Sequence, residues 1–502
     1  GDVTFGAALE STDAENDDIL TITSGAGAVT FTGAIGATNE LGGLNVNASA
    51  GAGDITFSST IGDTNGTRAG VIGTSDIGNT NTNNIAFSST LYSFDGTTTF
   101  ESASGEKFNL ASAATIETAG DTLSFTGGTI NLANGANLTM TTTGGAITVN
   151  GVVGDSSETV SISAGSGNTA TETVNITGDI GNADEILSVA ITAQDGITLT
   201  GVTIDPADAA DPNIAFTGPV TVSGTVVVTA DNTNNDGTVN FSSTIDGAGG
   251  TDNLSIQSGT GALTLSGIIG AGTSLDTLNI NTDAGTAAIT IAGLGDTDAA
   301  GAITTNIGNS TTSNMTFGGT YFRSSGDLTV TTAAGAGTID FTGAAPVVTT
   351  GGNAVSFVGG SILLADGADL TINTNISNAA SNGGNISIAG AIAGTSDEDL
   401  TLTTGTAGTG TVSVHAIGAG DEISTISIRG NTKIELDGDI KTSEAAGGGG
   451  TAPSLTFTGP VELISNIAIT TDTGGVDGIV SFTGAVNAEV AGSETLTIDS
   501  GT

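Results

Sequence analysis

Residues 20–36 read LTITSGAGAVTFTGAIG, and residues 254–270 read LSIQSGTGALTLSGIIG. In both stretches apolar residues alternate with small polar ones on either side of a turn rich in glycine and alanine. This two-residue period is typical of strands that are buried on one side. Clusters of Gly, Asn, Asp and Ser separate the strand-like segments, and no helical period of 3.6 residues is sustained. The sequence therefore predicts an all-β protein made of many short strands.

The strand pattern returns at a nearly constant interval, which favours a β-solenoid over a string of β-sandwich domains. Sandwich domains usually have a Trp or Tyr anchor and connections of varied length, whereas here one Phe-centred pattern repeats. We predict about 20 stacked coils of about 25 residues each. The phenylalanines that mark this interval are expected to point into the core and to stack on equivalent faces: Phe5, Phe31, Phe57, Phe216, Phe241, Phe457 and Phe482.

A longer duplication overlies the short period. Ile77-Gly78-Asn79 returns 230 residues later as Ile307-Gly308-Asn309, and Phe216–Val220 returns 241 residues later as Phe457–Val461. The order of such matches is preserved along the chain, which is the signature of an internal repeat. We therefore expect two tandem copies of a unit of about 240 residues, at residues 1–260 and 261–502.

The composition supports a folded repeat protein and argues against an enzyme. The 502 residues include 80 Gly, no Cys, no Trp and only 2 Tyr. Hydrophobic residues make up 37% and the mean hydropathy is +0.21, which is too apolar for a disordered chain. A β-helical polysaccharide lyase or glycosidase needs basic or paired acidic groups beside aromatic residues that hold sugar, and this chain is poor in basic and aromatic residues.

The cassettes at Leu20–Gly36 and Leu254–Gly270 resemble those of bacterial giant β-strand-repeat surface proteins, which include filamentous haemagglutinin-like and autotransporter-type adhesins. The resemblance covers the whole chain and is one of composition and period, without a catalytic or binding motif. It implies a secreted β-helical rod at the cell surface, with a structural or adhesive role. A cell-surface polysaccharide is one partner that such a role implies.

The net charge narrows the possible partners. Six basic residues stand against 52 acidic ones, which gives −46. This charge repels nucleic acid and anionic membranes, so we expect neither as a partner. No apolar run is long enough to span a bilayer. The absence of Cys is compatible with export but does not exclude a reducing compartment.

Two acidic segments are candidate Ca²⁺ sites, because Ca²⁺ takes six to eight oxygen ligands. Neither matches a known calcium-loop pattern, and a solvated turn is the simpler interpretation of each. Asp397–Asp399 and Asp421-Glu422 are weaker candidates. The two predicted sites comprise Asp13, Glu15, Asn16, Asp17 and Asp18, and Asp205, Asp208 and Asp211.

Other single residues give weaker signals. His415 is the only histidine, and an outward strand or turn position explains it better than a catalytic role. Tyr92 and Tyr321 hold similar places in the two copies; they could stack on a sugar, but covering a coil edge explains them more simply. Outward pairs such as Thr139 and Thr141 would suit an ice-binding face, although Thr is also common in ordinary strands.

Neither end of the sequence reads as a cap. Residues 495–502 followed by residues 1–6 would reproduce the internal junction at Gly259-Thr260-Gly261. Open strand edges template pairing with further strands, and solenoids normally carry capping coils. We expect either that the polypeptide continues beyond both termini or that identical units stack head to tail. In that arrangement the coil with Leu496 and Ile498 would lie against one equivalent to Val3 and Phe5.

Overall fold

The computed structural model describes residues 1–12, 17–63, 69–155, 157–165, 172–182, 186–206, 212–231, 236–283, 285–375, 383–395, 398–419, 423–442, 452–471, 477–490 and 492–500. These residues form 52 strands and no helix. The chain divides into two compact units, residues 1–243 and residues 244–502. The boundary at residues 260 and 261, inferred from the duplication, stays a prediction.

In unit 1 the strands form three parallel ladders, A, B and C. Ladder A contains β1 (Val3–Phe5), β3 (Val29–Phe31), β5 (Ile55–Phe57), β7 (Ile85–Phe87), β10 (Lys107–Leu110), β13 (Thr129–Leu132), β16 (Val152–Val153), β21 (Thr203–Ile204) and β24 (Thr225–Thr229). Ladder B contains β8 (Leu91–Phe94), β11 (Ala114–Thr118), β14 (Leu138–Thr142), β17 (Thr159–Ala164), β19 (Ser188–Ala193), β22 (Asn213–Thr217) and β25 (Val239–Phe241). Ladder C contains β2 (Ile19–Ile22), β4 (Gly43–Val46), β6 (Ser75–Gly78), β9 (Thr98–Glu101), β12 (Leu123–Thr126), β15 (Ile147–Val149), β18 (Thr173–Ile176), β20 (Gly196–Thr200) and β23 (Val220–Ser223).

Unit 2 likewise contains three parallel ladders, D, E and F. Ladder D contains β27 (Asn253–Gln257), β29 (Leu275–Ile280), β31 (Ala302–Ile307), β34 (Leu328–Thr331), β37 (Val355–Val358), β40 (Ile386–Ile388), β43 (Thr411–Val414), β45 (Lys433–Leu436), β48 (Val461–Leu463) and β51 (Val486–Ala488). Ladder E contains β28 (Leu263–Ile269), β30 (Ile289–Leu294), β32 (Asn314–Phe317), β35 (Thr338–Phe341), β38 (Ser361–Leu364), β41 (Ile392–Ala393), β46 (Ile440–Lys441), β49 (Ile467–Thr470) and β52 (Leu496–Asp499). Ladder F contains β26 (Ile245–Gly247), β33 (Tyr321–Arg323), β36 (Val347–Thr349), β39 (Leu370–Asn373), β42 (Asp399–Thr403), β44 (Thr425–Arg429), β47 (Ser454–Thr458) and β50 (Ile479–Phe482), with single residues of β28 and β30 between β26 and β33.

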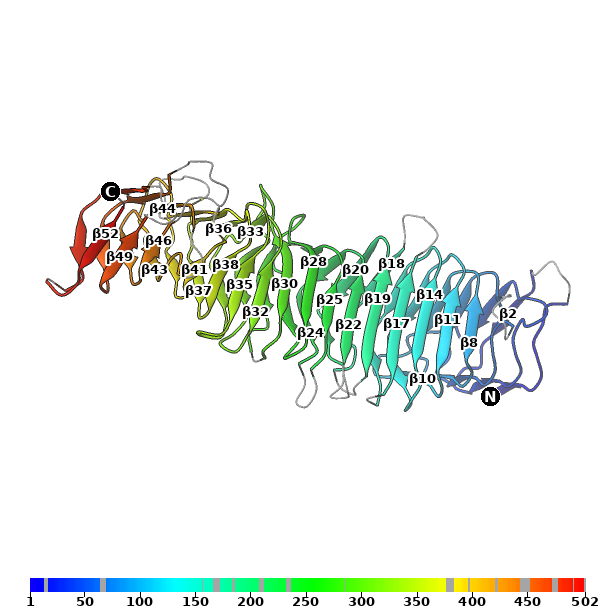
Figure 1. The fold of residues 1–502 in the computed structure, drawn as a ribbon. Coiled ribbons are helices and arrows are strands. Elements are labelled where there is room, and N and C mark those ends of the chain that lie inside the picture. Colours follow the sequence, from blue (N-terminus) through cyan, green and yellow to red (C-terminus); the bar gives the residue numbers. More distant parts are fainter. Residues whose placement is uncertain are drawn as a thin grey trace. The chain divides into compact units, whose positions relative to one another are not determined.

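The pairing confirms the predicted β-solenoid, with about 18 turns where about 20 were expected. Each strand pairs in parallel with a strand one coil later in the sequence, as Phe31 does with Phe57. Within each unit the successive strands lie side by side (Figure 1). A β-sandwich is built from antiparallel strands, so the alternative of sandwich domains is wrong. Parallel strands one coil apart bring like residues together, which is why similar cassettes recur.

Alternation within the strands creates the core. In β3 and β5 the first and third residues are buried and the middle residue is half-buried. Phe31 stacks on Phe5 and on Phe57 with ring centroids 5.2 Å apart in both pairs. Phe216 and Phe241 stack at 4.5 Å, and Phe457 and Phe482 at 4.8 Å.

The predicted inward direction is confirmed for Phe31, Phe57, Phe216, Phe241 and Phe457, each at most 1% exposed. The expectation that all stacks occupy equivalent faces is wrong within unit 1. One stack belongs to ladder A and the other, in β22 and β25, belongs to ladder B. The spacing of about 25 residues sets the coil length, but it does not say which strand of the coil carries the ring.

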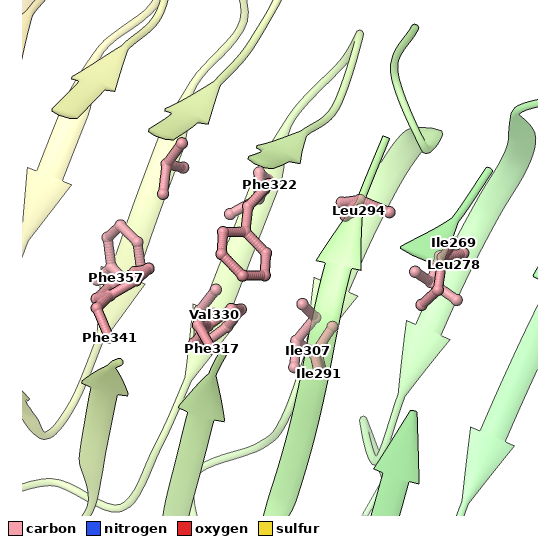
Figure 2. Close-up of a pocket in the computed structure, with 12 residues that line it drawn as sticks. Ile269, Leu278, Ile291, Leu294, Ile307, Phe317, Phe322, Val330, Phe341 and Phe357 are labelled. Carbon is pink, nitrogen blue, oxygen red and sulfur yellow. The ribbon is translucent and has the colours of Figure 1, made fainter. Parts of the chain in front are cut away.

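The interior of unit 2 is filled by side chains. The internal gap among Leu294, Phe322, Phe341 and their neighbours has a volume of only about 10 Å³, and all twelve residues around it are apolar (Figure 2). A void of this size and chemistry stays dry. A ligand for this part of the chain must therefore bind on the outward surface.

Candidate functional site

The two predicted Ca²⁺ sites lie partly outside the described residues. Asp13, Glu15 and Asn16 of the first site, and Asp208 and Asp211 of the second, are not among them. Asp17 and Asp18 are exposed and Asp205 is half-buried. Within the described part of the chain no three His, Cys, Asp or Glu side chains are grouped as metal ligands. Calcium binding at either segment stays a prediction.

Asp18 has a local structural role. Its carboxylate accepts hydrogen bonds from the Thr12 N–H at 3.0 Å and from the hydroxyls of Ser11 at 2.8 Å and Thr12 at 3.1 Å. The Thr12 N–H, with these hydroxyls, holds the pKa of Asp18 below its usual value. Asp18 is therefore tied to Ser11 and Thr12 by hydrogen bonds.

Two glutamates that the sequence analysis did not single out close turns in the same way. Glu158 and Glu398 are 240 residues apart and both are fully buried. The Glu158 carboxylate accepts hydrogen bonds from the N–H groups of Asp155 and Gly135, both at 2.6 Å, and from the Ser157 hydroxyl at 2.7 Å. Glu398 likewise accepts the N–H of the residue three positions earlier, Thr395, at 2.6 Å. We name these the glutamate latches.

The pKa of Glu158 gives a prediction for acid stability. Burial opposes its ionisation, but the hydrogen bonds from Asp155, Ser157 and Gly135 outweigh burial and lower the pKa below 4.5. Because the folded-state pKa is lowered, the stabilisation is present above pH 4.5 and is lost as the pH falls through the folded-state value. We expect Glu158→Gln to cost about 1–3 kcal/mol at pH 7 and progressively less toward pH 3.

Urea unfolding of the parent chain and of Glu158→Gln at several pH values measures the difference in their free energies of unfolding. The outward-facing Glu117→Gln in β11 is the matched control, and it should change stability little at any pH. An effect of Glu158→Gln that does not depend on pH would show that packing, and not the charge, is what matters.

A buried polar corner occurs in each unit. Asn47 and Asn281 have left-handed backbones, with φ of 51° and 46°, and are fully buried. Their side-chain oxygens accept the N–H of Ser24 at 2.9 Å and of Ser258 at 2.6 Å. In unit 2, the Asn309 amide donates to the Asn281 carbonyl at 2.7 Å.

The same contacts recur 230–234 residues apart: Ser24, Asn47, Asn79 and Thr82 in unit 1, and Ser258, Asn281, Asn309 and Thr312 in unit 2. Each corner links three successive coils and satisfies their buried backbone groups. The repeated Asn79 and Asn309 were visible in the sequence, but nothing there marked them as buried.

One ion-pair cluster shows how stacked carboxylates are neutralised. Glu435 and Glu462 lie opposite each other on neighbouring coils. The Lys433 ammonium lies 2.6 Å from a carboxylate oxygen of each. The hydrogen bonds to Glu435 and then to Glu462 raise the pKa of Lys433. With six basic residues in the whole chain, few carboxylates can be neutralised in this way, and solvent cations must screen most of the others.

The single residues considered as sites fall in different environments. His415 is exposed, with its Nδ1 3.8 Å from an Asp437 carboxylate oxygen. Tyr92 is fully buried, and its hydroxyl accepts the Ser89 N–H at 2.7 Å, so it cannot stack on a sugar. Burial raises the pKa of Tyr92 to about 12. Tyr321 is half-buried on the outward side of β33.

The inward counterpart of Tyr92 is Phe322, not Tyr321. Tyr92 packs edge-on against Phe87 at 4.9 Å, and Phe322 packs edge-on against Phe317 at 4.8 Å. The matched places of the two tyrosines in the sequence are therefore offset by one residue, which reverses the direction of the side chain.

The outer coils expose side chains that are buried elsewhere. In the last coil of unit 2, Val486 is 37% and Ile498 is 45% exposed, whereas their partners one coil earlier, Val461 and Ile469, are each 1% exposed. Phe482 in this coil is half-buried. In the first coil of unit 1, Val3, Phe5 and Leu9 are likewise half-buried, although the coil after it is fully packed. Apolar side chains of both outer coils are therefore more exposed than their counterparts in the neighbouring coils.

Comparison with protein-family models, with curated proteins and with solved structures gave no match to this chain. The described residues also contain no helix that is long and apolar enough to cross a membrane.

Proposed function

We propose that this chain is an extracellular structural repeat protein that builds a filament, sheath or adhesin stalk at the cell surface, and that it is not an enzyme. Copies of this chain join end to end, with the last coil of one copy covered by the first coil of the next. The next copy is either a second molecule or a further repeat of the same polypeptide. The observation that carries the proposal is the match between the two outer coils.

The two outer coils have nearly the same strand spacing. In the first coil, Leu9 lies four positions after Phe5, and Leu20 lies eleven positions after Leu9. In the last coil, Val486 lies four positions after Phe482, and Leu496 lies ten positions after Val486. Coils with the same spacing can stack with every strand above a strand. The apolar side chains of one then fall on those of the other.

The internal junction at Gly259-Thr260-Gly261 supports one register for this contact. In unit 2, Leu254 and Ile256 lie in β27 of ladder D, whereas Leu263 and Leu265 lie in β28 of ladder E. The two cassettes of that junction are thus consecutive strands of a coil and do not stack. By analogy, β1 of the next copy follows β52 along the coil and lies on β50. This register specifies the expected contact between the coil with Leu496 and Ile498 and the coil with Val3 and Phe5.

In this register each strand meets a similar one. Phe5 of the next copy covers Phe482, which extends the stack formed by Phe457 and Phe482. Leu20-Thr21-Ile22 covers the identical tripeptide Leu496-Thr497-Ile498. Complete burial of one such Phe, Leu or Ile side chain is worth about 1.5–3 kcal/mol, and the paired strand edges add backbone hydrogen bonds.

Blocking one end at a time tests the proposal. We expect the purified chain to form filaments visible by electron microscopy. Phe5→Lys should block the first coil and Ile498→Lys the last coil, because each places a charge in the contact. Each variant alone should then stay monomeric in analytical ultracentrifugation. An equimolar mixture should give dimers and no longer species, because each variant keeps one intact end.

Thr56→Lys, an outward substitution in β5, is the matched control and should leave assembly unchanged. A parent chain that stays monomeric at high concentration would rule out stacking of separate copies. Filaments formed equally well by both blocked variants would contradict this contact.

We also propose that Ca²⁺ or another divalent cation stabilises the protein. The supporting observations are the charge of −46 and the carboxylates of both outer coils, which include the exposed Asp17, Asp18, Glu489 and Asp499. Stacking brings these groups closer together, and divalent cations offset their repulsion.

Millimolar Ca²⁺ is therefore expected to raise the melting temperature, and a chelator should reverse the effect. At a Ca²⁺ concentration ten times the dissociation constant the gain is about 1.4 kcal/mol. Differential scanning calorimetry at equal ionic strength in NaCl is the control. Equal melting curves in the two salts would reduce the effect to general screening.

A further inference from the structure

The outward side of unit 2 contains a slot that neither the charge pattern nor the cassette period foreshadowed. Three successive coils contribute Ile268, Gly293 and Tyr321. Ile268 pairs in register with Gly293, and Leu294 pairs with Phe322, which places Gly293 beside Tyr321. The missing side chain at Gly293 leaves a gap between an aliphatic and an aromatic side chain.

The residues that follow these three show that the slot faces outward. Ile269, Leu294 and Phe322 line the internal gap of the core (Figure 2) and are at most 2% exposed. Because side chains alternate along a strand, the residues before them point to the surface. Ile268 is 40% exposed and Tyr321 is half-buried. The pairing register of β28 is irregular between Leu265 and Ile268. Such β-bulges are common beside binding sites.

The slot has the size and chemistry of a site for a small ring. Its volume is about 300 Å³, at the lower end of the range for small-molecule pockets. Neighbouring strands are about 4.8 Å apart, so Ile268 and Tyr321 are separated by about twice that distance. A puckered saturated ring above Gly293 would contact both, because carbon atoms touch at about 3.5–4.0 Å.

The surroundings favour an uncharged, hydroxylated ligand. None of the residues that line the slot carries a charge, although the chain has 52 acidic residues. Thr320 adds a hydroxyl to the lining, and Tyr321 adds an apolar ring face with a polar tip. The net charge would repel an anionic polymer.

We infer that this slot binds the uncharged sugar rings of a polysaccharide, with one pyranose ring held between the Tyr321 ring and the Ile268 side chain. The apolar face of the sugar packs on Tyr321, and its hydroxyl groups face Thr320 and water. This site does not depend on end-to-end stacking, so a blocked monomer such as Ile498→Lys can be used to test it.

Tyrosine fluorescence provides a direct readout, because the chain has two tyrosines and no tryptophan. Tyr92→Phe removes the buried tyrosine, at a position whose counterpart in unit 2 is already Phe322, and leaves Tyr321 as the only reporter. Cellohexaose and chitohexaose serve as neutral probes and polygalacturonate as the charged one. We expect a saturable change in Tyr321 emission with at least one neutral probe and none with polygalacturonate.

Two variants test the slot itself, with cosedimentation on insoluble cellulose and chitin as the assay. Tyr321→Ala removes the stacking face. Gly293→Val fills the gap, and the added Cβ would lie 3.4 Å from the nearest heavy atom, which is ordinary van der Waals contact. Both should weaken binding about tenfold or more, which corresponds to the loss of about 1.4 kcal/mol for an aromatic contact.

Gly120→Val in unit 1, where no heavy atom lies within 4 Å of the added Cβ, is the matched control and should bind like the parent. Unchanged melting of all variants confirms that they fold. The inference is overturned if no neutral glycan binds, if both slot variants bind as well as the control, or if only polygalacturonate changes the Tyr321 emission.

Discussion

Replacement of Phe57 by alanine is expected to lower the free energy of unfolding of unit 1 by about 3–5 kcal/mol. Phe57 is 1% exposed and stacks on Phe31 at 5.2 Å and on Phe87 at 5.8 Å. A void at this position removes ring contacts from the coils on both sides. The parallel backbones limit collapse, because neighbouring strands stay about 4.8 Å apart.

Tyr92 reports this loss locally, because its ring centroid lies 6.4 Å from that of Phe57. Urea unfolding followed by tyrosine fluorescence, with hydrogen exchange of the β3, β5 and β7 amides, measures the change. Thr56→Ala in the same strand faces outward and should cost less than about 1 kcal/mol. Equal costs at the two positions would contradict the assignment of faces in ladder A.

The second large effect is expected at the buried polar corner of unit 2. Asn281→Ala leaves the buried Ser258 N–H without its acceptor, at a cost of about 1–3 kcal/mol. Alanine has a Cβ but no polar side chain that could form a local hydrogen bond at the positive φ of 46°. This backbone strain adds about 1–2 kcal/mol to the loss of stability. We therefore expect a total loss of about 2–5 kcal/mol.

Asn281→Gly separates the two causes, because glycine accepts a positive φ without strain. It should cost less than alanine by about 1–2 kcal/mol. Asn279→Ala, which removes only an outward hydrogen bond from Asn306, is the control and should cost about 0.5–1.5 kcal/mol. If alanine were tolerated as well as glycine, backbone strain would not contribute, and Asn281 would act only as an acceptor.

Much of the fold follows from two periods in the sequence. Alternation within strands such as Val29–Phe31 predicted which side chains are buried, and the interval between Phe31 and Phe57 predicted which strands pair. Both signals recur along the whole chain, because each coil needs similar residues at equivalent positions. The stack of Phe216 on Phe241 was predicted for the same reason, although its ladder was not.

The buried polar corners and the glutamate latches could not be predicted, because the hydrogen bonds that define them do not follow the period of the coils. Asn47 reads like any turn asparagine, and only the fold shows that its side chain is fully buried and accepts the Ser24 N–H. Glu158 reads like a solvated acid, yet backbone N–H groups from two coils surround it. The slot beside Tyr321 depends on a one-residue offset within a strand, and sequence matching does not resolve such an offset.

The serial pairing of strands also has a mechanical consequence. Each coil is held by the coils directly before and after it, as β47 is by β44 and β50. A force that peels an outer coil away loads only one layer of hydrogen bonds at a time. Each coil of about 25 residues would release about 85 Å of chain as it extends. Under tension the protein should therefore lengthen in a sawtooth of similar steps, each absorbing work, while the remaining coils keep their structure.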